Sequence, residues 1–374
     1  MPNFHQKDRF GADYNNDSLY IFIAASTPTS GTISYHSKQG NSFTNTFTIS
    51  DTNQIYKFSI AYQNFELEGF NISGILRNST QVKPISQQAF HVVSESEVTV
   101  YALSQAIKTS DAFLTIPTDA LGTEYLVMAY RSDGTATSTT QIDGSSTPSQ
   151  CAIIATDSNT IVHITPTTST FIGGLAPRDI ILQKGEVYLL QDSISPKKLN
   201  GDLTGTSITS DKPVAVFGGQ QRARLPIGFP TLNSRDFLCE EMQPVPTWGR
   251  NYFITPYPQA TNTRNRGTDL YRIMASEDNT LVFLNGNPLV MLNKGQLYEN
   301  VLNQSEYISS SAPILIAQFK KTSVESQGTN VTSDPFMMII PPREQYLKQY
   351  RCTNVQVRDI GSDTTYTEQY MTVI

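Results

Sequence analysis

The feature that most constrains the fold is the block Cys151–Gln221, because related sequence occurs elsewhere in the same chain. Its segment 154–166, IATDSNTIVHITP, matches MASEDNTLVFLNG at 274–286 nearly position for position. Several matches in one order indicate repeated structural units rather than a single large domain. The further matches are 182–192 with 292–302, 206–221 with 307–322, and, in an earlier copy, 47–60 and 91–105.

The linkers between the units repeat as well. The first carries the series Asp111, Phe113, Pro117, Tyr125 and Tyr130, and related series occur at 236–257 and 334–350. This periodicity predicts a first unit at 10–108, a linker and second unit at 109–234, a linker and third unit at 235–333, and a linker with the start of a fourth unit at 334–374.

The pattern inside each unit predicts β structure. Short runs rich in Val, Ile, Thr and aromatic residues alternate with polar positions and end at Gly, Asn or Asp. Each unit is roughly a hundred residues long with about seven strands, which fits an antiparallel sandwich better than a four-stranded propeller blade. The predicted fold class is therefore all-β, with tandem antiparallel β-sandwich-like repeats.

Local turn signals predict two hairpins in the central block. Ala152–Ala155 and Ile161–Ile164 flank a polar segment that contains Asp and Asn. Ile180–Leu182 and Val187–Leu190 flank a second turn, in which Gly185 is expected to adopt a positive φ.

Composition limits the classes of function. The net charge of −6 argues against nucleic-acid binding, which needs a basic face. No apolar run approaches the ~20 residues of a membrane-spanning helix, and Met1–Arg9 lacks the apolar core of a signal peptide. Cys151, Cys239 and Cys352 show no metal-ligand spacing, so they are expected to be buried thiols.

A search for catalytic chemistry yields little. The sequence contains no HExxH, GxSxG, phosphate-binding or dinucleotide-binding motif. His163 and His91 lie within predicted strands and are interpreted as packing residues. Asp236, Glu240 and Glu241 are the candidates for a glycosidase pair, but they belong to a repeated linker, which favours a structural role. We expect no enzyme activity, no cofactor and no metal.

Four long motifs stand out: DAFLTIPTDALGTEYLVMAY (111–130), DLTGTSITSDKPVAVFGG (202–219), EEMQPVPTWGRNYFITP (240–256) and DPFMMIIPPREQY (334–346). They resemble the IgGFc-binding protein N-terminal domain family, and the resemblance extends from about Phe10 to Tyr350. It implies a secreted or surface-attached binding protein with no catalysis, metal or cofactor. Animal members tend to place cysteines around the segment matching Gly218–Glu241, whereas this chain carries only Cys239 there, which favours a bacterial or phage-borne relative.

The function expected first is a non-enzymatic binding or adhesion module that presents loops on a β scaffold. Arg131–Ser149 and Gln220–Arg235 are the longest polar loops without a counterpart in every unit, so contacts are expected there. Trp248 is either an aromatic anchor for a partner or, as the favoured reading, a packing residue of its linker. The residues selected for binding are Gln220, Arg222, Arg224 and Trp248.

The expected partner is a protein or glycoprotein that is mucin-like or immunoglobulin-like, and the expected location is extracellular or at the cell surface. Two alternatives from other classes stay open. One is a structural component of a virion or filament, in which neighbouring copies are the partners. The other is a carbohydrate-active enzyme that uses the acidic residues of the second linker.

Overall fold

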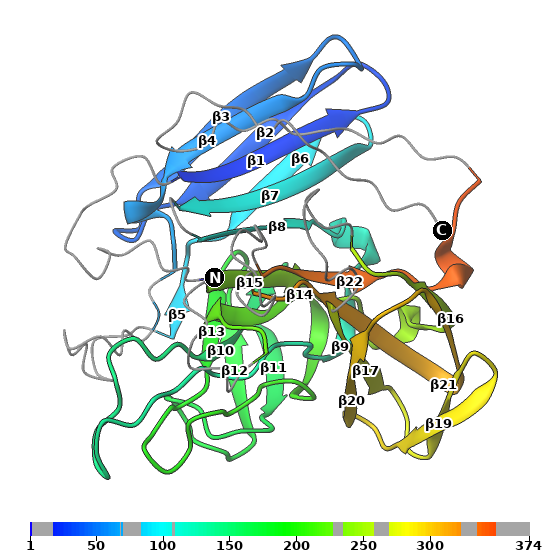
Figure 1. Ribbon diagram of the computed structural model, residues 1–374. Helices are drawn as coiled ribbons and strands as arrows, with labels where there is room; N and C mark the ends of the chain where they lie inside the picture. Colours follow the sequence, from blue (N-terminus) through cyan, green and yellow to red (C-terminus); the bar gives the residue numbers. More distant parts are fainter. Residues whose placement is uncertain are drawn as a thin grey trace, which may run out of the picture.

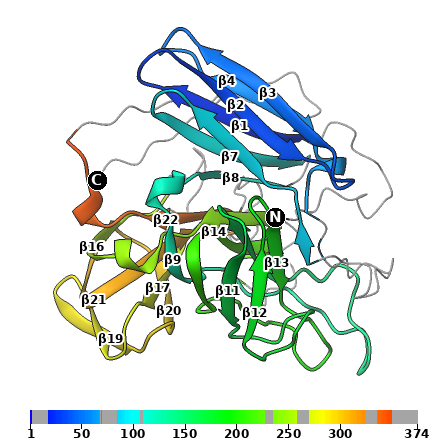
Figure 2. The ribbon, with the colours of Figure 1, turned by 180° about the vertical axis from the view of Figure 1, so that it is seen from behind.

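The computed structural model describes residues 1, 18–67, 69, 84–106, 109–226, 235–257, 269–322 and 335–348. This part of the chain is all-β: its strands form four antiparallel sheets, and its only helical elements are short 3-10 turns. None of its helices is long and apolar enough to cross a membrane. The sheets form three groups, one blue to cyan at the top of Figure 1 and two below it, green and yellow to orange (Figures 1 and 2). The predicted fold class is confirmed.

The first unit consists of two sheets that share one apolar core. Ile23 comes from one sheet and Ile33 and Phe47 from the other, and all three lie in the same buried cluster. The strand orders are β4-β1-β7-β8 and β3-β2-β6. The strands are β1 (Ser18–Ala25), β2 (Thr29–His36), β3 (Ser42–Ile49), β4 (Tyr56–Ala61), β6 (Phe90–Ser94), β7 (Val98–Ala106) and β8 (Thr109–Leu114), with the 3-10 turn η1 (Tyr62–Asn64) after β4.

The second unit is one larger sheet of order β12-β11-β14-β10-β13-β5, with β9 and β15 also paired to β14. The short strand β5 (Ile85–Ser86) comes from the first unit and adds to the edge at β13. The other strands are β9 (Gly122–Leu126), β10 (Ser149–Ala155), β11 (Thr160–Thr165), β12 (Arg178–Leu182), β13 (Val187–Gln191), β14 (Ser207–Ala223) and β15 (Asp236–Glu241).

The third unit repeats this topology, as the sequence repeat predicts. Its order is β19-β18-β21-β17-β20, with β16 and β22 also paired to β21. The strands are β16 (Gly249–Ile254), β17 (Asp269–Ala275), β18 (Thr280–Leu284), β19 (Asn287–Leu292), β20 (Leu297–Leu302), β21 (Glu306–Phe319) and β22 (Met337–Ile340).

One long strand curls each of these two sheets into a sandwich-like shape. The first half of β14 pairs with β11 and β9, and the second half pairs with β10 and β15. The register shifts between Thr209 and Val214, and Pro213 lies at this shift. A proline donates no main-chain hydrogen bond, which suits the point where a strand changes partners. In the first unit two separate strands replace this long strand: β6 corresponds to the first half of β14 and β7 to the second half.

Both hairpins predicted in the central block are wrong. β10 pairs with β13 and β14, whereas β11 pairs with β12 and β14, so the turn between β10 and β11 joins strands that do not pair with each other. The same holds for the turn between β12 and β13. Both turns use left-handed backbone, with φ of 54° at Asn159 and 78° at Gly185. The predicted positive φ of Gly185 is therefore confirmed, although its turn crosses between the two halves of the sheet.

The first two linkers each contribute to two sheets, and the described part of the third contributes to one. β8 closes the first-unit sheet by pairing with β7, the 3-10 turn η2 (Thr118–Ala120) follows, and β9 then pairs with β14 of the second unit. In the second linker the same sequence is β15, η3 (Val245–Thr247) and β16. In the third it is β22 followed by η5 (Arg343–Gln345). The chain thus passes from one sheet to the next inside the linker.

The second and third units are joined by a buried arginine. Arg272 is fully buried, and its guanidinium lies 2.7 Å from the carboxylate of Glu299 and 2.9 Å from that of Asp202. The same group lies 4.5 Å from the ring centroid of Tyr130. Burial lowers the pKa of Arg272, but the two carboxylates outweigh this and raise it, so the charge is retained.

The junction of the first and second units has a different chemistry at the equivalent place. Ala152 pairs with Leu189 in the second unit, where Arg272 pairs with Glu299 in the third. Both residues of the second unit are apolar, and with Leu67 of the first unit they form a small separate cluster. One junction is therefore closed by paired charges and the other by apolar contact.

Candidate binding surface

The described ends of the second variable loop, residues 220–226 and Arg235, lie beside the first loop, Arg131–Ser149, whereas residues 227–234 lie outside the described residues. The main chains of Asp133 and Thr147 exchange hydrogen bonds of 2.9 and 3.1 Å, which closes the loop between β9 and β10 on itself. The Thr147 hydroxyl then donates to the carbonyl of Arg222 at 2.9 Å. The end of β14 is thereby attached to the β9–β10 loop, so the described parts of both loops belong to one surface.

Arginine side chains gather around a single carboxylate at this place. Arg224 Nε and Arg235 Nε lie 3.4 and 3.2 Å from Asp133 Oδ2. Arg235 also donates from Nη1 to the carbonyl of Ser145 at 2.6 Å. Burial lowers the pKa of Arg235, and the positive charges of Arg224 and Arg222 lower it further, while Asp133 opposes them. We call Arg222, Arg224, Arg235 and Asp133 the arginine cluster.

Two of the selected residues serve the scaffold instead. Gln220 is fully buried, and its side-chain amide donates to the carbonyl and the hydroxyl of Thr147, each at 3.0 Å. Trp248 is 6% exposed and donates from its indole N–H to the carbonyl of Gln243 at 3.0 Å. Neither side chain is available to a partner, and the structural interpretation of Trp248 agrees with this position. Arg222 is half-buried, and the side chain of Arg224 is 15% exposed.

No sequence pattern identifies Asp133 and Arg235, the other half of the arginine cluster. Asp133 lies in a loop without a counterpart in every unit, and Arg235 directly precedes the linker motif at Asp236. Only the pairing of the two loops brings these residues next to Arg224.

The acidic residues considered for glycoside hydrolysis accept hydrogen bonds from neighbouring strands. Asp236 Oδ1 accepts from the Thr109 hydroxyl and the Ser110 N–H, both at 2.6 Å. Glu241 Oε2 accepts from the Ile116 N–H at 2.9 Å. These bonds satisfy main-chain donors of the first linker that its own sheet leaves open, which is a structural use of the carboxylates.

Burial shifts the titration of these acids. It raises the pKa of Glu241 to about 8 against the hydrogen bond from Ile116. It raises the pKa of Glu240 well above its usual range, and the nearby charges of Asp111 and Glu241 add to this.

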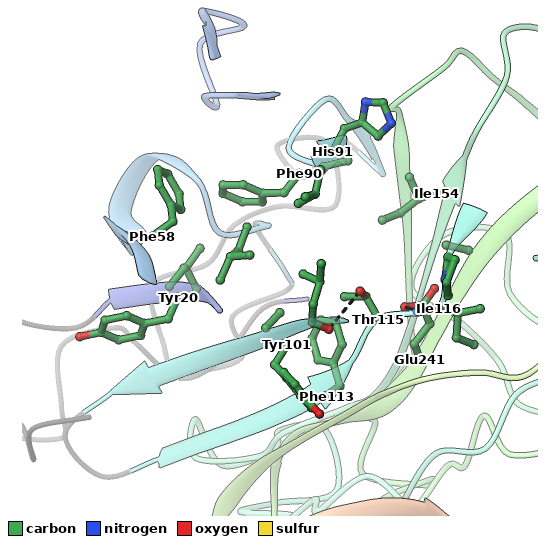
Figure 3. A pocket seen from close by; sticks show the side chains of 18 of the residues that line it. Tyr20, Phe58, Phe90, His91, Tyr101, Phe113, Thr115, Ile116, Ile154 and Glu241 are labelled. Carbon is green, nitrogen blue, oxygen red and sulfur yellow. Dashed lines mark hydrogen bonds between the residues drawn. The ribbon is translucent and has the colours of Figure 1, made fainter. Parts of the chain in front are cut away.

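A cavity of 1510 Å³ lies between the first and second units. In Figure 3, Phe58 and Phe90 of the first unit line one side, and Ile154 and Glu241 of the second unit line the opposite side. Burial and the charge of Lys184 lower the pKa of His91 at the rim. The lining is mainly aliphatic and aromatic, so the cavity suits an apolar occupant rather than a charged one.

Three polar side chains on the outer face of β11 and β12, those of Asp179, His163 and Thr165, are linked in the acid–histidine–hydroxyl order of a catalytic triad. His163 Nδ1 lies 2.6 Å from Asp179 Oδ1, and the Thr165 hydroxyl lies 3.3 Å from Nε2. The side chains of His163 and Asp179 are 51% and 66% exposed and do not line the cavity. Such an open position leaves these side chains fully hydrated, so they are interpreted as surface pairing across two strands.

Repeated antiparallel sheets with exposed variable loops define an extended β scaffold, and the comparisons identify its family. The family model described as IgGFc binding protein matches residues 111–374. The chain therefore belongs to the IgGFc-binding protein family.

The human IgGFc-binding protein is 27% identical to this chain over 275 residues. That match covers 71% of this chain but 4% of the human protein, so the chain corresponds to a small part of its relative. These comparisons give no support to the expectation of a bacterial or phage-borne relative. No solved structure matches the chain.

Proposed function

We propose that this chain is a non-enzymatic, extracellular binding module that recognises a protein or glycoprotein through the arginine cluster and the loops around it. The observation that carries the proposal is the meeting of two variable loops at Asp133 on a scaffold that belongs to a family of binding proteins. Arginine is enriched at protein interfaces because its planar group makes several directed hydrogen bonds.

The immunoglobulin Fc fragment and mucin glycoproteins are the partners to test first. The family description and the name of the human relative both refer to IgG Fc. Mucins carry acidic groups, and a basic cluster on a chain of net charge −6 provides a local complement to them.

The family match gives no support to the alternative of a virion or filament component, so it is not carried further. A carbohydrate-active enzyme is also less suitable, because the carboxylates of Asp236 and Glu241 are engaged with the main chain of the first linker.

The test is a binding measurement with immobilised IgG Fc and with purified mucin, using the whole chain. The variant Arg222→Glu/Arg224→Glu is expected to weaken binding at least tenfold, because it reverses two charges at the surface. A matched variant, Arg250→Glu/Arg343→Glu, reverses two exposed arginines, one in β16 and one in η5, and is expected to bind normally. Equal binding by both variants would remove the arginine cluster from the proposal, and no binding by the unmodified chain would remove the partners.

A further inference from the structure

The three units offer three equivalent strand edges, and linker strands occupy two of them. In the second unit the first half of β14 accepts β9, with Ile208 opposite Tyr125. In the third unit β21 accepts β16, with Ile308 opposite Tyr252. Each donated strand follows the 3-10 turn of the preceding linker.

The equivalent edge in the first unit belongs to β6. Among the described residues, β6 pairs with β2 on one side and with no strand on the other. Glu95 N–H donates to the carbonyl of Ser30 in β2 at 2.9 Å. The main-chain groups of Glu95, and of Val93 and His91 before it, therefore face β2. Main-chain groups alternate sides along a strand, so those of Phe90, Val92 and Ser94 face the open edge.

The cavity described above adjoins this edge at the position of a buried tyrosine in the other units. Tyr125 and Tyr252 are 0% exposed, and their hydroxyls donate to the carbonyls of Val214 and Ile314. The repeat places Val98 at the corresponding position in the first unit, and Val98 lines the cavity. The first unit therefore contains a hollow where the others hold a tyrosine ring.

The first linker provides the remaining contacts that such a strand makes elsewhere. In the third unit, Glu344 accepts from the N–H of Arg250 at 3.0 Å, and a Cβ on Gly249 would lie 2.2 Å from Pro342. Pro117 and Asp119 hold the corresponding places in the first linker, and both line the cavity. An acceptor carboxylate and a packing proline thus flank the open edge.

The third linker has the sequence of the matching donor. Tyr350 stands four residues after Tyr346, as Tyr125 stands four residues after Leu121 and Tyr252 after Trp248. Tyr350 lies outside the described residues. The other two linkers already supply β9 and β16, so this segment is the one whose repeat-equivalent acceptor, β6, has no second partner strand among the described residues.

We propose that the segment starting at Leu347 pairs with β6 of the same chain and inserts Tyr350 into the cavity, closing the three units into a ring. We assign the pairing to one chain rather than to two copies because the three linkers begin next to one another. The carboxylate of Asp111, in the first linker, accepts hydrogen bonds from Cys239 N–H in the second and Met337 N–H in the third. In both views the orange turn η5 lies at the level between the third unit and the first (Figures 1 and 2).

Disulfide trapping tests this pairing. The register predicts Val93 opposite Gln349, as Thr209 lies opposite Glu124 in the second unit. Val127 N–H donates to the carbonyl of Thr206, so Val127 and Thr206 form a hydrogen-bonded pair. Hydrogen-bonded and non-hydrogen-bonded pairs alternate along antiparallel strands, so Thr209 and Glu124 form a non-hydrogen-bonded pair, in which the side chains are closer and a disulfide is favoured. The variant Val93→Cys/Gln349→Cys, with Cys352→Ser to remove a competing thiol, is expected to form an intramolecular disulfide on mild oxidation.

Two controls calibrate the experiment. Glu124→Cys/Thr209→Cys is the positive control, and Val93→Cys/Lys348→Cys, which places the second thiol on the other face of the strand, is the negative control. Disulfide-linked dimers would overturn the proposal in favour of docking between copies. No cross-link, while the positive control oxidises, would overturn it as well.

Thermal unfolding provides a second readout. Tyr350→Ala is expected to lower Tm by an amount similar to Tyr252→Ala, because each removes a ring from an equivalent apolar slot. A Tm equal to that of the unmodified chain would show that Tyr350 does not occupy the cavity.

Discussion

The carboxylate of Asp111 accepts a hydrogen bond of 3.0 Å from the main-chain N–H of Cys239, which links the first linker strand to the second. The carboxylate of Glu241 makes the reverse link by accepting from Ile116 in the first linker. Edge strands with open N–H groups tend to associate with other chains. Here acidic side chains occupy those donors, so the linker strands meet without merging into one continuous sheet.

The raised pKa values of Asp111, Glu240 and Glu241 predict that the free energy of unfolding depends on pH. The folded-state pKa of Glu241 is about 8, above that of an exposed Glu, so the folded state binds more protons than the unfolded state between those values. The free energy of unfolding is therefore expected to fall as pH rises from about 5 to 8, by at most about 1.4 kcal/mol per pH unit for one group. Urea unfolding at several pH values measures this.

The matched variant for that prediction is Glu241→Gln, which keeps an oxygen acceptor for Ile116 but cannot ionise. It is expected to flatten part of the pH dependence, while Asp111 and Glu240, whose pKa values are also raised, supply the rest. An unchanged slope would show that Glu241 ionises normally in the folded chain.

Replacing Arg272 by Leu is expected to destabilise the chain by about 3–5 kcal/mol, because Glu299 and Asp202 would keep their charges without their buried partner. Chemical denaturation followed by fluorescence measures the change. The exposed pair of Lys294 and Glu124, 2.7 Å apart, is the control, and Lys294→Ala is expected to cost less than about 1 kcal/mol. Similar losses in both variants would argue against a special role for Arg272.

The two buried tyrosines of the linker strands should behave alike. Tyr125→Phe and Tyr252→Phe each remove one hydroxyl that donates to a carbonyl of the long central strand. Each is expected to lower the free energy of unfolding by about 1 kcal/mol. Tyr56→Phe removes a 3.3 Å bond at an exposed site and is expected to change little. A large difference between Tyr125 and Tyr252 would contradict the equivalence of the two units.

The sequence predicted the repeat and the β class because both depend on local patterns that recur. Gly185 was identified as a positive-φ residue from its turn alone, and its φ of 78° agrees. The hairpins were wrong because alternation reports where strands and turns lie and not which strands pair. β10 and β11 each pair with β14 instead, and the paired residues lie 42 or more positions apart in the sequence.

The candidate site was predicted only in part for a related reason. The loops were selected as variable regions, but the contact of Asp133 with Arg235 joins residues with no repeat or motif to connect them. Gln220 was selected for binding, but tertiary packing buries it, and Trp248 is buried in keeping with its favoured interpretation as a packing residue. Arg272 is a charged residue within an apolar strand, which signals a buried partner, although nothing local identifies that partner as Glu299.

The thiols of Cys151 and Cys239 are free and buried, and burial raises the pKa of both. A thiol reacts through its thiolate, so neither is expected to react with a water-soluble disulfide reagent over hours under native conditions. In a Cys352→Ser background, both should react within minutes once urea unfolds the chain. The absorbance of the released thiolate measures the number of reacted groups, and the unfolded sample is the control for total thiol. Rapid native labelling of either residue would mean that the sheet around β10 and β15 opens readily, which contradicts the closed core described here.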